Sequence, residues 1–369
     1  ASDVYKRQQV GNDLPIGITS PAQTITAGGV VQPIDYYFAE DLKPEISNSI
    51  EVGTEWKFFN SRLDFDFTFY RTDTKNQLIR VNTTAEQRPY RWINAGKIRN
   101  TGVEITLGAT PLMNDDFRWK TQFNFATNKN KIVSLGGTPN FQYASGNVSM
   151  PYKMMVVEGG SLGDIYSRAD LRRDSNGDIY QDMDGNIFVD NKTQTKDFIK
   201  LGSVFPDANL AWRNDFRWRN FNFGFLLTAR LGGVVFSRTQ AVMDYYGVSA
   251  SSADARDAGG IIFNGNDLID AQKWYQTVAN GDTTPQYYTY SATNFRLQEL
   301  SLGYTLPRKW FRNKMGLTVS FVGRNLWMIY NKAPYDPETV ATVNSYYQGI
   351  DYFMSPSTRN IGFNLRLKF

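Results

Sequence analysis

Apolar and polar residues alternate along much of the chain in long segments. In residues 61–70, Leu63, Phe65, Phe67 and Phe69 alternate with polar side chains. A period of two places all the apolar side chains on one face of a β-strand. The pattern predicts nine strands, at 48–59, 61–73, 98–110, 117–130, 208–218, 221–235, 293–306, 314–328 and 358–369.

The length of these strands and the connections between them are unusual for a soluble sheet. Strands of globular proteins have about 5–6 residues, whereas a tilted strand that crosses a bilayer needs about 9–11. Tight turns are expected at Asn60, 111–116, 219–220 and 307–313. They alternate with long connections at 74–97, 131–207, 236–292 and 329–357. Short turns on one side and long loops on the other are typical of an outer-membrane β-barrel.

Aromatic residues strengthen this interpretation. The chain has 25 Phe, 21 Tyr and 8 Trp, yet its mean hydropathy is −0.44. Many rings lie next to the tight turns, where a membrane barrel carries an interfacial aromatic girdle. They are Trp56, Phe58, Phe59, Phe117, Trp119, Phe216, Trp218, Phe221, Tyr304 and Trp310. The alternative, the core of a soluble β-sandwich, fits the strand lengths and the one-sided loops less well.

The number of predicted strands indicates whether they could form a closed barrel by themselves. Nine is odd, and a further hairpin around Met154–Val157 and Asp164–Leu171 would raise it to eleven. Single-chain bacterial barrels have even numbers of strands, and an open edge in lipid leaves backbone groups unpaired. We therefore expect an all-β, antiparallel up-and-down transmembrane β-barrel, of which this chain is a C-terminal portion of about nine to eleven strands.

Composition excludes several chemistries. The 369 residues include no His and no Cys, and 40 basic against 36 acidic side chains give a formal charge of +4. Ser-His-Asp and Cys-His catalysis, zinc fingers and iron–sulfur clusters are therefore excluded. The small charge gives no reason to expect nucleic acid as a partner. Gly159–Gly163 matches the G-x-S-x-G pattern of hydrolases, but without His we interpret it as a turn, and we expect neither an enzyme nor a cofactor.

One loop carries alternating oxygen ligands. Asp182, Asp184 and Asn186 are spaced as in calcium loops, but the Glu at the twelfth position of such loops is absent. We expect an Asx-Gly turn and no metal site, with calcium as the weaker alternative.

Another loop is rich in rings that could stack on sugars or on peptide side chains. The candidate substrate-binding residues are Tyr245, Tyr246, Trp274, Tyr275, Tyr287 and Tyr288. Packing within the loop, or contact with a lipoprotein lid, is the alternative explanation.

The chain ends on a strand with a terminal Phe, a pattern that resembles the assembly signal of bacterial outer-membrane barrels. The apolar residues of this candidate signal are Ile361, Phe363, Leu365, Leu367 and Phe369.

Several short motifs occur in one order along residues 40–369. They are Leu42-Lys43-Pro44-Glu45, Glu51-Val52-Gly53, Arg62-Leu63, Asn94-Ala95-Gly96, Asn100-Thr101-Gly102-Val103-Glu104, Gly202-Ser203 to Pro206, Arg296-Leu297, Ser301-Leu302-Gly303-Tyr304, Gly323-Arg324-Asn325-Leu326, Asp336-Pro337-Glu338 and Pro356. In this combination the chain resembles the C-terminal barrel half of SusC/RagA-type TonB-linked transporters of the bacterial outer membrane.

The resemblance implies a barrel of about 22 strands with a plugged lumen, embedded in outer-membrane lipid. It also implies import of oligosaccharide or peptide cargo together with a SusD-like lipoprotein, powered through TonB. The plug and the segment that contacts TonB are expected upstream. We assign residues 10–369 to the C-terminal part of the barrel, and Ala1 to Gln9 to a non-native, adapter-derived segment. The alternatives are a passive porin or adhesin barrel and a secreted soluble all-β carbohydrate-binding protein or hydrolase.

Overall fold

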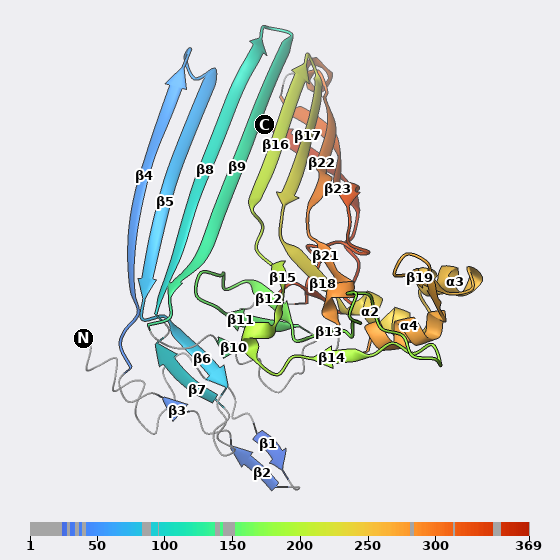
Figure 1. The fold of residues 1–369 in the computed structure, drawn as a ribbon. Coiled ribbons are helices and arrows are strands. Elements are labelled where there is room, and N and C mark those ends of the chain that lie inside the picture. The colour runs from blue at the N-terminus through green and yellow to red at the C-terminus, as the bar shows by residue number, and fades with distance from the viewer. Residues whose placement is uncertain are drawn as a thin grey trace.

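The computed structural model describes most of the chain and shows one long sheet with smaller elements packed at one end (Figure 1). The described residues are 24–27, 30–33, 37–38, 42–82, 90–94, 96–136, 141–142, 152–280, 284–312, 314–341 and 348–368.

The long sheet is an antiparallel meander of nine strands in the order β25-β23-β22-β17-β16-β9-β8-β5-β4. The strands are β4 (Ile46–Phe58), β5 (Leu63–Lys75), β8 (Lys97–Met113), β9 (Phe117–Ser134), β16 (Ala208–Trp218), β17 (Phe221–Leu231), β22 (Asn294–Thr305), β23 (Gly316–Asn331) and β25 (Asn360–Lys368). All nine were predicted from alternation, and each lies within a few residues of its expected place. Their lengths, 9 to 18 residues, are those of membrane-spanning strands.

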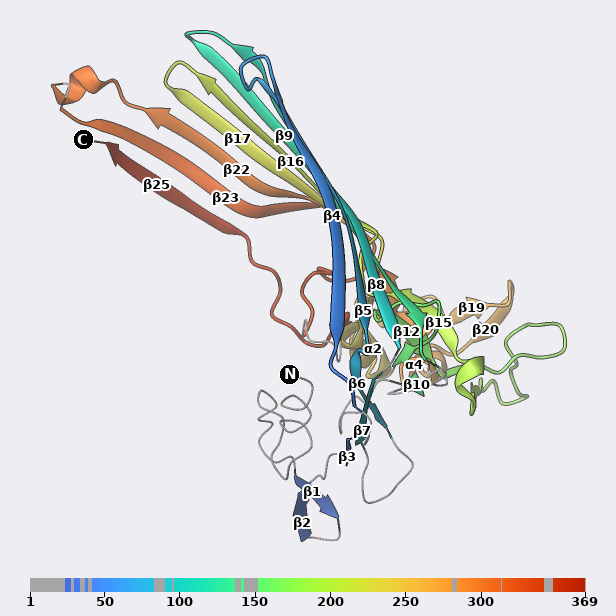
Figure 2. The ribbon, with the colours of Figure 1, turned by 90° about the vertical axis from the view of Figure 1, so that its left-hand side faces the viewer.

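The sheet is curved but does not close on itself (Figure 2). In the described residues β4 pairs only with β5, and β25 only with β23. The hairpin suspected in the connection 131–207 does form between β11 (Lys153–Val156) and β12 (Asp164–Ser167), but it belongs to a separate sheet. Within the described residues the long sheet therefore has nine strands rather than eleven, and a barrel of about 22 strands stays a prediction.

The turns at one end of the sheet are tight, as expected. Residues Phe59, Asn60 and Ser61 all have positive φ, between 55° and 59°, and reverse the chain between β4 and β5. Arg219, with φ 50°, and Asn220 form the two-residue connection of β16 and β17. Left-handed conformations of this kind match the right-handed twist of paired strands.

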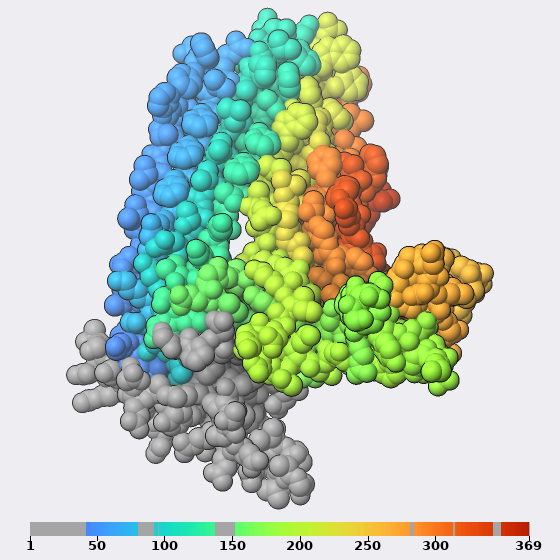
Figure 3. Space-filling view, viewed as in Figure 1, coloured from blue at the N-terminus to red at the C-terminus, as the bar shows by residue number. Residues whose placement is uncertain are grey.

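The long connections fold into a second body at the opposite end, which we call the loop region: the described residues of 135–207, 232–293 and 332–359 (Figures 1 and 3). Beside β11 and β12, its strands are β10 (Phe141–Gln142), β13 (Ala169–Leu171), β14 (Val189–Asn191), β15 (Ile199–Ser203), β18 (Val234–Ser237), β19 (Ile261–Phe263), β20 (Asp267–Ile269), β21 (Thr289–Ser291) and β24 (Ile350–Asp351). Its helices are α2 (Arg238–Tyr245), α3 (Ala250–Asp257) and α4 (Ala271–Val278), with 3-10 turns η1 (Thr195–Asp197) and η2 (Pro285–Tyr288).

Other short elements lie outside these two bodies. They are β1 (Thr24–Ala27), β2 (Val30–Pro33), β3 (Tyr37–Phe38), β6 (Leu78–Asn82), β7 (Tyr90–Asn94) and the 3-10 turn η3 (Arg308–Phe311) between β22 and β23. No helix in the described part of the chain is long and apolar enough to span a membrane.

The two faces of the long sheet differ in polarity. One cross-strand row consists of Trp56, Phe65, Leu107, Phe123 and Trp212, each opposite the next across β4, β5, β8, β9 and β16. Most of these large apolar side chains are exposed. A water-soluble protein rarely exposes a continuous apolar face of this extent, whereas lipid covers such a face in a membrane barrel.

The opposite face is polar and carries ion pairs both within and between strands. Arg213 lies 3.0 Å from Asp215 and 3.5 Å from Glu299, and Glu299 lies 3.6 Å from Arg324. This face corresponds to the lumen of the predicted barrel.

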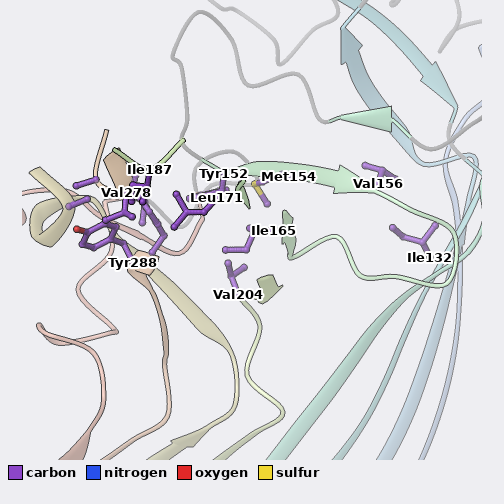
Figure 4. Close-up of a cluster of buried hydrophobic side chains, with 14 of the residues drawn as sticks. Ile132, Tyr152, Met154, Val156, Ile165, Leu171, Ile187, Val204, Val278 and Tyr288 are labelled. Carbon is purple, nitrogen blue, oxygen red and sulfur yellow. The ribbon is translucent and has the colours of Figure 1, made fainter. Parts of the chain in front are cut away.

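The buried apolar core lies in the loop region rather than in the sheet (Figure 4). Ile132, at the loop end of β9, begins a cluster that continues through Val156, Ile165 and Val204 to Tyr288. The loop region is therefore packed like a small soluble domain on the end of a membrane sheet.

Candidate functional site

Three short helices form the part of the loop region that carries the predicted aromatic residues. Each begins at a side-chain cap: Ser237 accepts a hydrogen bond from the N–H of Gln240, Ser249 from that of Ser252, and Asp270 from that of Lys273. Such caps satisfy N–H groups that have no partner within the helix. They fix where α2, α3 and α4 begin and thereby place the side chains that follow.

A cavity of about 580 Å³ lies between these helices, η2 and the chain that follows β23. This volume is within the range of small-molecule sites in proteins, roughly 300–1,000 Å³. Six aromatic side chains line it: Trp274, Tyr275, Tyr287, Tyr288, Tyr290 and Tyr335. Trp274 and Tyr287 meet edge to face with ring centroids 5.7 Å apart, which holds one wall in place.

Among the described residues that line this cavity, Asp244, at the end of α2, is the only Asp, Glu, Lys or Arg. Its side chain is 4% exposed. Oδ1 accepts hydrogen bonds from Gln240 Nε2 at 2.8 Å, from Ser251 Oγ at 2.9 Å and from Ser249 Oγ. Neutral donors thus orient the carboxylate from several sides.

Burial changes the acidity of the phenols in the cavity. Burial first, and then the negative charge of Asp244, raise the pKa of Tyr288. The same two causes raise the pKa of Tyr290 to about 12. Both side chains therefore stay protonated at neutral pH and present hydroxyl groups that can donate hydrogen bonds.

The structure brings four of the six predicted aromatic residues together around this cavity. The other two, Tyr245 and Tyr246, line a smaller neighbouring cavity of about 290 Å³, which Tyr275 and Asp244 also line. Sequence reasoning missed Asp244 and Tyr335. Asp244 directly precedes the Tyr pair and was a visible signal, whereas Tyr335 comes from a different loop and only the tertiary structure brings it here.

The Asp-Gly segment folds as the predicted turn. Oδ1 of Asp182 accepts the backbone N–H groups of Asp184 at 3.0 Å and Asn186 at 2.8 Å, and Asn186 Nδ2 donates to Asp182 Oδ2 at 3.1 Å. The amide groups thus use the oxygens that a cation would need. Within the described residues, no cluster of three or more acidic, His or Cys side chains could hold a metal ion.

The remaining predicted features are also visible. Ile361, Phe363, Leu365 and Leu367 of the candidate assembly signal are exposed on the apolar face of β25, and Phe369 lies outside the described residues. Gly159–Gly163 forms a turn, in which the Ser161 N–H donates to Asp164 Oδ2 at 2.9 Å.

Comparison with known proteins agrees with this architecture. The family described as "TonB dependent receptor-like, beta-barrel" matches residues 1–234, more than half of the chain. The chain belongs to this family. Its long sheet is accordingly that of an outer-membrane receptor barrel, and the protein is not an enzyme.

Curated relatives identify the branch of the family. TonB-dependent receptor P3 of Formosa agariphila is 28% identical over 370 residues, which cover 90% of this chain and 35% of the relative. TonB-dependent receptor SusC of Bacteroides thetaiotaomicron is 23% identical over 330 residues, which cover 84% of this chain and 31% of SusC. The resemblance to the SusC/RagA type is confirmed. The chain spans about a third of the length of the curated relatives it matches.

Solved structures share the fold. The RagAB peptide importer in its "closed-closed" state matches with a TM-score of 0.64 and 18% identity, over 94% of this chain and 38% of the other. Its "open-open" state also gives a TM-score of 0.64, over 88% of this chain and 34% of the other. At this identity the likeness shows the fold alone.

Proposed function

We propose that the chain is part of the barrel of an outer-membrane importer that takes up oligosaccharides or peptides together with a SusD-like lipoprotein, powered through TonB. The observation that carries the proposal is the position of the aromatic cavity: it lies in the loop region, at the end of the sheet opposite the tight turns. In outer-membrane barrels the tight turns are periplasmic and the long loops are extracellular. The cavity is then located where cargo would first meet the protein.

Two further findings support the proposal. SusC and the RagAB peptide importer are among the proteins that this chain resembles. The loop region also has a buried core, which continues into the sheet at Ile98 and Ile132 and holds the cavity walls in a defined arrangement. A preformed site of this kind lowers the entropic cost of binding.

The test is uptake by cells that make the full-length protein. Fluorescent oligosaccharides and peptides are supplied to the native bacterium, to a strain without the gene and to a strain without TonB. The proposal predicts that uptake of at least one cargo class is lost in both deletion strains. Uptake that needs the gene but not TonB would identify a passive porin instead. Co-purification with the tagged protein tests the lipoprotein partner.

A further inference from the structure

The cavity around Asp244 has an unbalanced charge. Of the described residues that line it, only Asp244 is acidic and none is Lys or Arg. Within the described part of the chain, Asp244 makes no salt bridge, and its hydrogen-bond partners are an amide and hydroxyl groups. Arg256, which lines the neighbouring cavity, instead donates to the carbonyl of Gly247 at 2.9 Å.

A buried carboxylate is normally compensated by a cation of the protein, because burial disfavours an unpaired charge. Here neutral donors hold the carboxylate, and no Lys or Arg of the described residues forms a salt bridge with it. A ligand that carries a positive charge would supply what the cavity lacks, and a negatively charged ligand would be repelled.

The aromatic walls favour the same sign of charge. The face of a Trp or Tyr ring attracts a cation within about 6 Å of its centroid, and aromatic cages are used to bind ammonium groups. Trp274, Tyr275 and Tyr288 lie around the same cavity as Asp244. The rings and the carboxylate can therefore contact the same bound cation.

We propose that this cavity binds a protonated amino group of the cargo. The proposal rests on the import function proposed above and narrows its cargo to molecules that carry an amine. Such a group has two sources of the same chemistry, an amino sugar with a free amine and a peptide with a free N-terminus. The ammonium group lies against Asp244, and the adjoining part of the ligand packs against the rings.

The experiment measures binding to the purified full-length protein in detergent by calorimetry. Two matched pairs of probes are used: a glucosamine tetramer and its N-acetylated form, and a triglycine peptide and its N-acetylated form. Acetylation removes the positive charge and leaves the rest of the molecule in place. We expect the amine of at least one pair to bind roughly tenfold more tightly than its acetylated partner. The pair that shows this preference identifies the source.

A pair of variants locates the preference. Asp244→Asn keeps the size of the side chain and removes its charge, so the preference for the amine is expected to disappear. Asp257→Asn removes the same charge from an exposed position on α3. This control variant is expected to keep the preference for the amine. If Asp244→Asn does not fold, the comparison of amine and acetylated probes on the unmodified protein still decides the question.

Equal binding of both members of each pair, or no binding of either amine, would overturn the proposal, as would a preference that survives in Asp244→Asn. The proposed import function fails separately. Amine-selective binding without TonB-dependent uptake would support the amine site and refute the import function. TonB-dependent uptake without a preference for the amine would support the import function and refute the amine site.

Discussion

The membrane sheet and the loop region place their apolar side chains in opposite ways. Leu107 of β8 lies on the apolar face of the sheet and is 42% exposed, although a leucine is usually found inside. Ile165 of β12, in the loop region, is 0% exposed and belongs to a packed cluster. One face of the sheet therefore needs an apolar solvent. The loop region instead buries its apolar side chains, as a protein in water does.

This difference fits the two roles proposed for the chain, a barrel wall and a binding site. The sheet is held by backbone hydrogen bonds between long strands, and its outer face tolerates any apolar side chain because lipid adapts to it. The loop region is held by close packing, which fixes the geometry of a binding cavity.

The junction of the two regions depends on a buried ion pair. Arg296, on β22, donates two hydrogen bonds to Asp336 in the loop region, at 2.9 and 3.0 Å, and both side chains are almost fully buried. Arg296→Met leaves the Asp336 carboxylate buried without its partner, so we expect a loss of about 3–5 kcal/mol of folding stability. Chemical denaturation of the detergent-solubilised protein measures it.

The matched control is Arg172→Met, which removes an exposed ion pair with Asp190 inside the loop region. Surface pairs contribute at most about 1 kcal/mol. Equal effects of the two substitutions would show that the buried pair does not hold the regions together.

Truncation of the loop core is expected to act locally. Ile165→Ala removes buried methyl groups and leaves a cavity, at a cost of about 2–5 kcal/mol. Hydrogen exchange should become faster in β12 and β15 and stay unchanged in β5 and β8. Ile262→Ala, at an exposed position of β19, is the control. Equally accelerated exchange in the sheet would mean that the two regions unfold as one unit.

A charged substitution on the apolar face of the sheet should destabilise the protein, whereas a charged substitution at an exposed position of the loop region should not. Leu107→Arg is expected to lower stability by about 2–4 kcal/mol, because the face lies in lipid. Val248→Arg, at a loop residue that is 68% exposed, should change it by less than about 0.5 kcal/mol. Unfolding from lipid vesicles, followed by tryptophan fluorescence, compares them. A neutral Leu107→Arg would contradict the assignment of this face to lipid.

The junction should also weaken in acid. Burial raises the pKa of Asp336, but hydrogen bonds from Arg296 and the Glu338 N–H outweigh it, so the pKa lies below its ordinary value of 3.8. A carboxyl with a lowered pKa stabilises the folded state above its ordinary pKa and loses this contribution as the pH falls through the folded pKa. Stability should thus decline below about pH 4. The stability of Arg296→Met should decline less as the pH falls. An identical decline in both proteins would refute the assignment of this acid sensitivity to the Arg296–Asp336 pair.

The smallest effect is expected in the Asp-Gly turn. Asp182→Ala removes the acceptor of the Asp184 and Asn186 amides, whose hydrogen exchange should become roughly fivefold faster. Calcium should not change the exchange of the unmodified protein. Protection that increases with calcium would instead support a metal site here.

The strands of the sheet could be predicted because residues close together in the sequence specify each of them. Alternation and tight turns fix each strand within a few residues of sequence, as for 208–218, where the predicted and observed strands coincide. The helices were not predicted, because α2, α3 and α4 have only eight residues each, too few for a clear apolar period. The caps Ser237, Ser249 and Asp270 were the signals available for them.

The candidate site was predictable only in part. Four of its rings were found because they lie in one aromatic-rich loop. The separation of the rings into two cavities and the arrival of Tyr335 from another loop depend on tertiary packing, which leaves no periodic pattern in the sequence. In the described residues the two outermost strands, β4 and β25, each pair on one side only, and the alternation pattern of single strands did not specify which strands would pair at the ends of the sheet.

The most direct test of the contrast is spin labelling at single introduced Cys residues, because these 369 residues contain no Cys. Any Cys in other parts of the full-length protein is first replaced by Ser. Leu107→Cys and Val248→Cys are labelled in the full-length protein in outer-membrane vesicles, and the accessibility of each label to oxygen and to a water-soluble nickel complex is measured. We predict that the label at 107 is reached by oxygen and not by nickel, and that the label at 248 is reached by nickel. Nickel access at both positions would contradict the assignment of the sheet to the membrane.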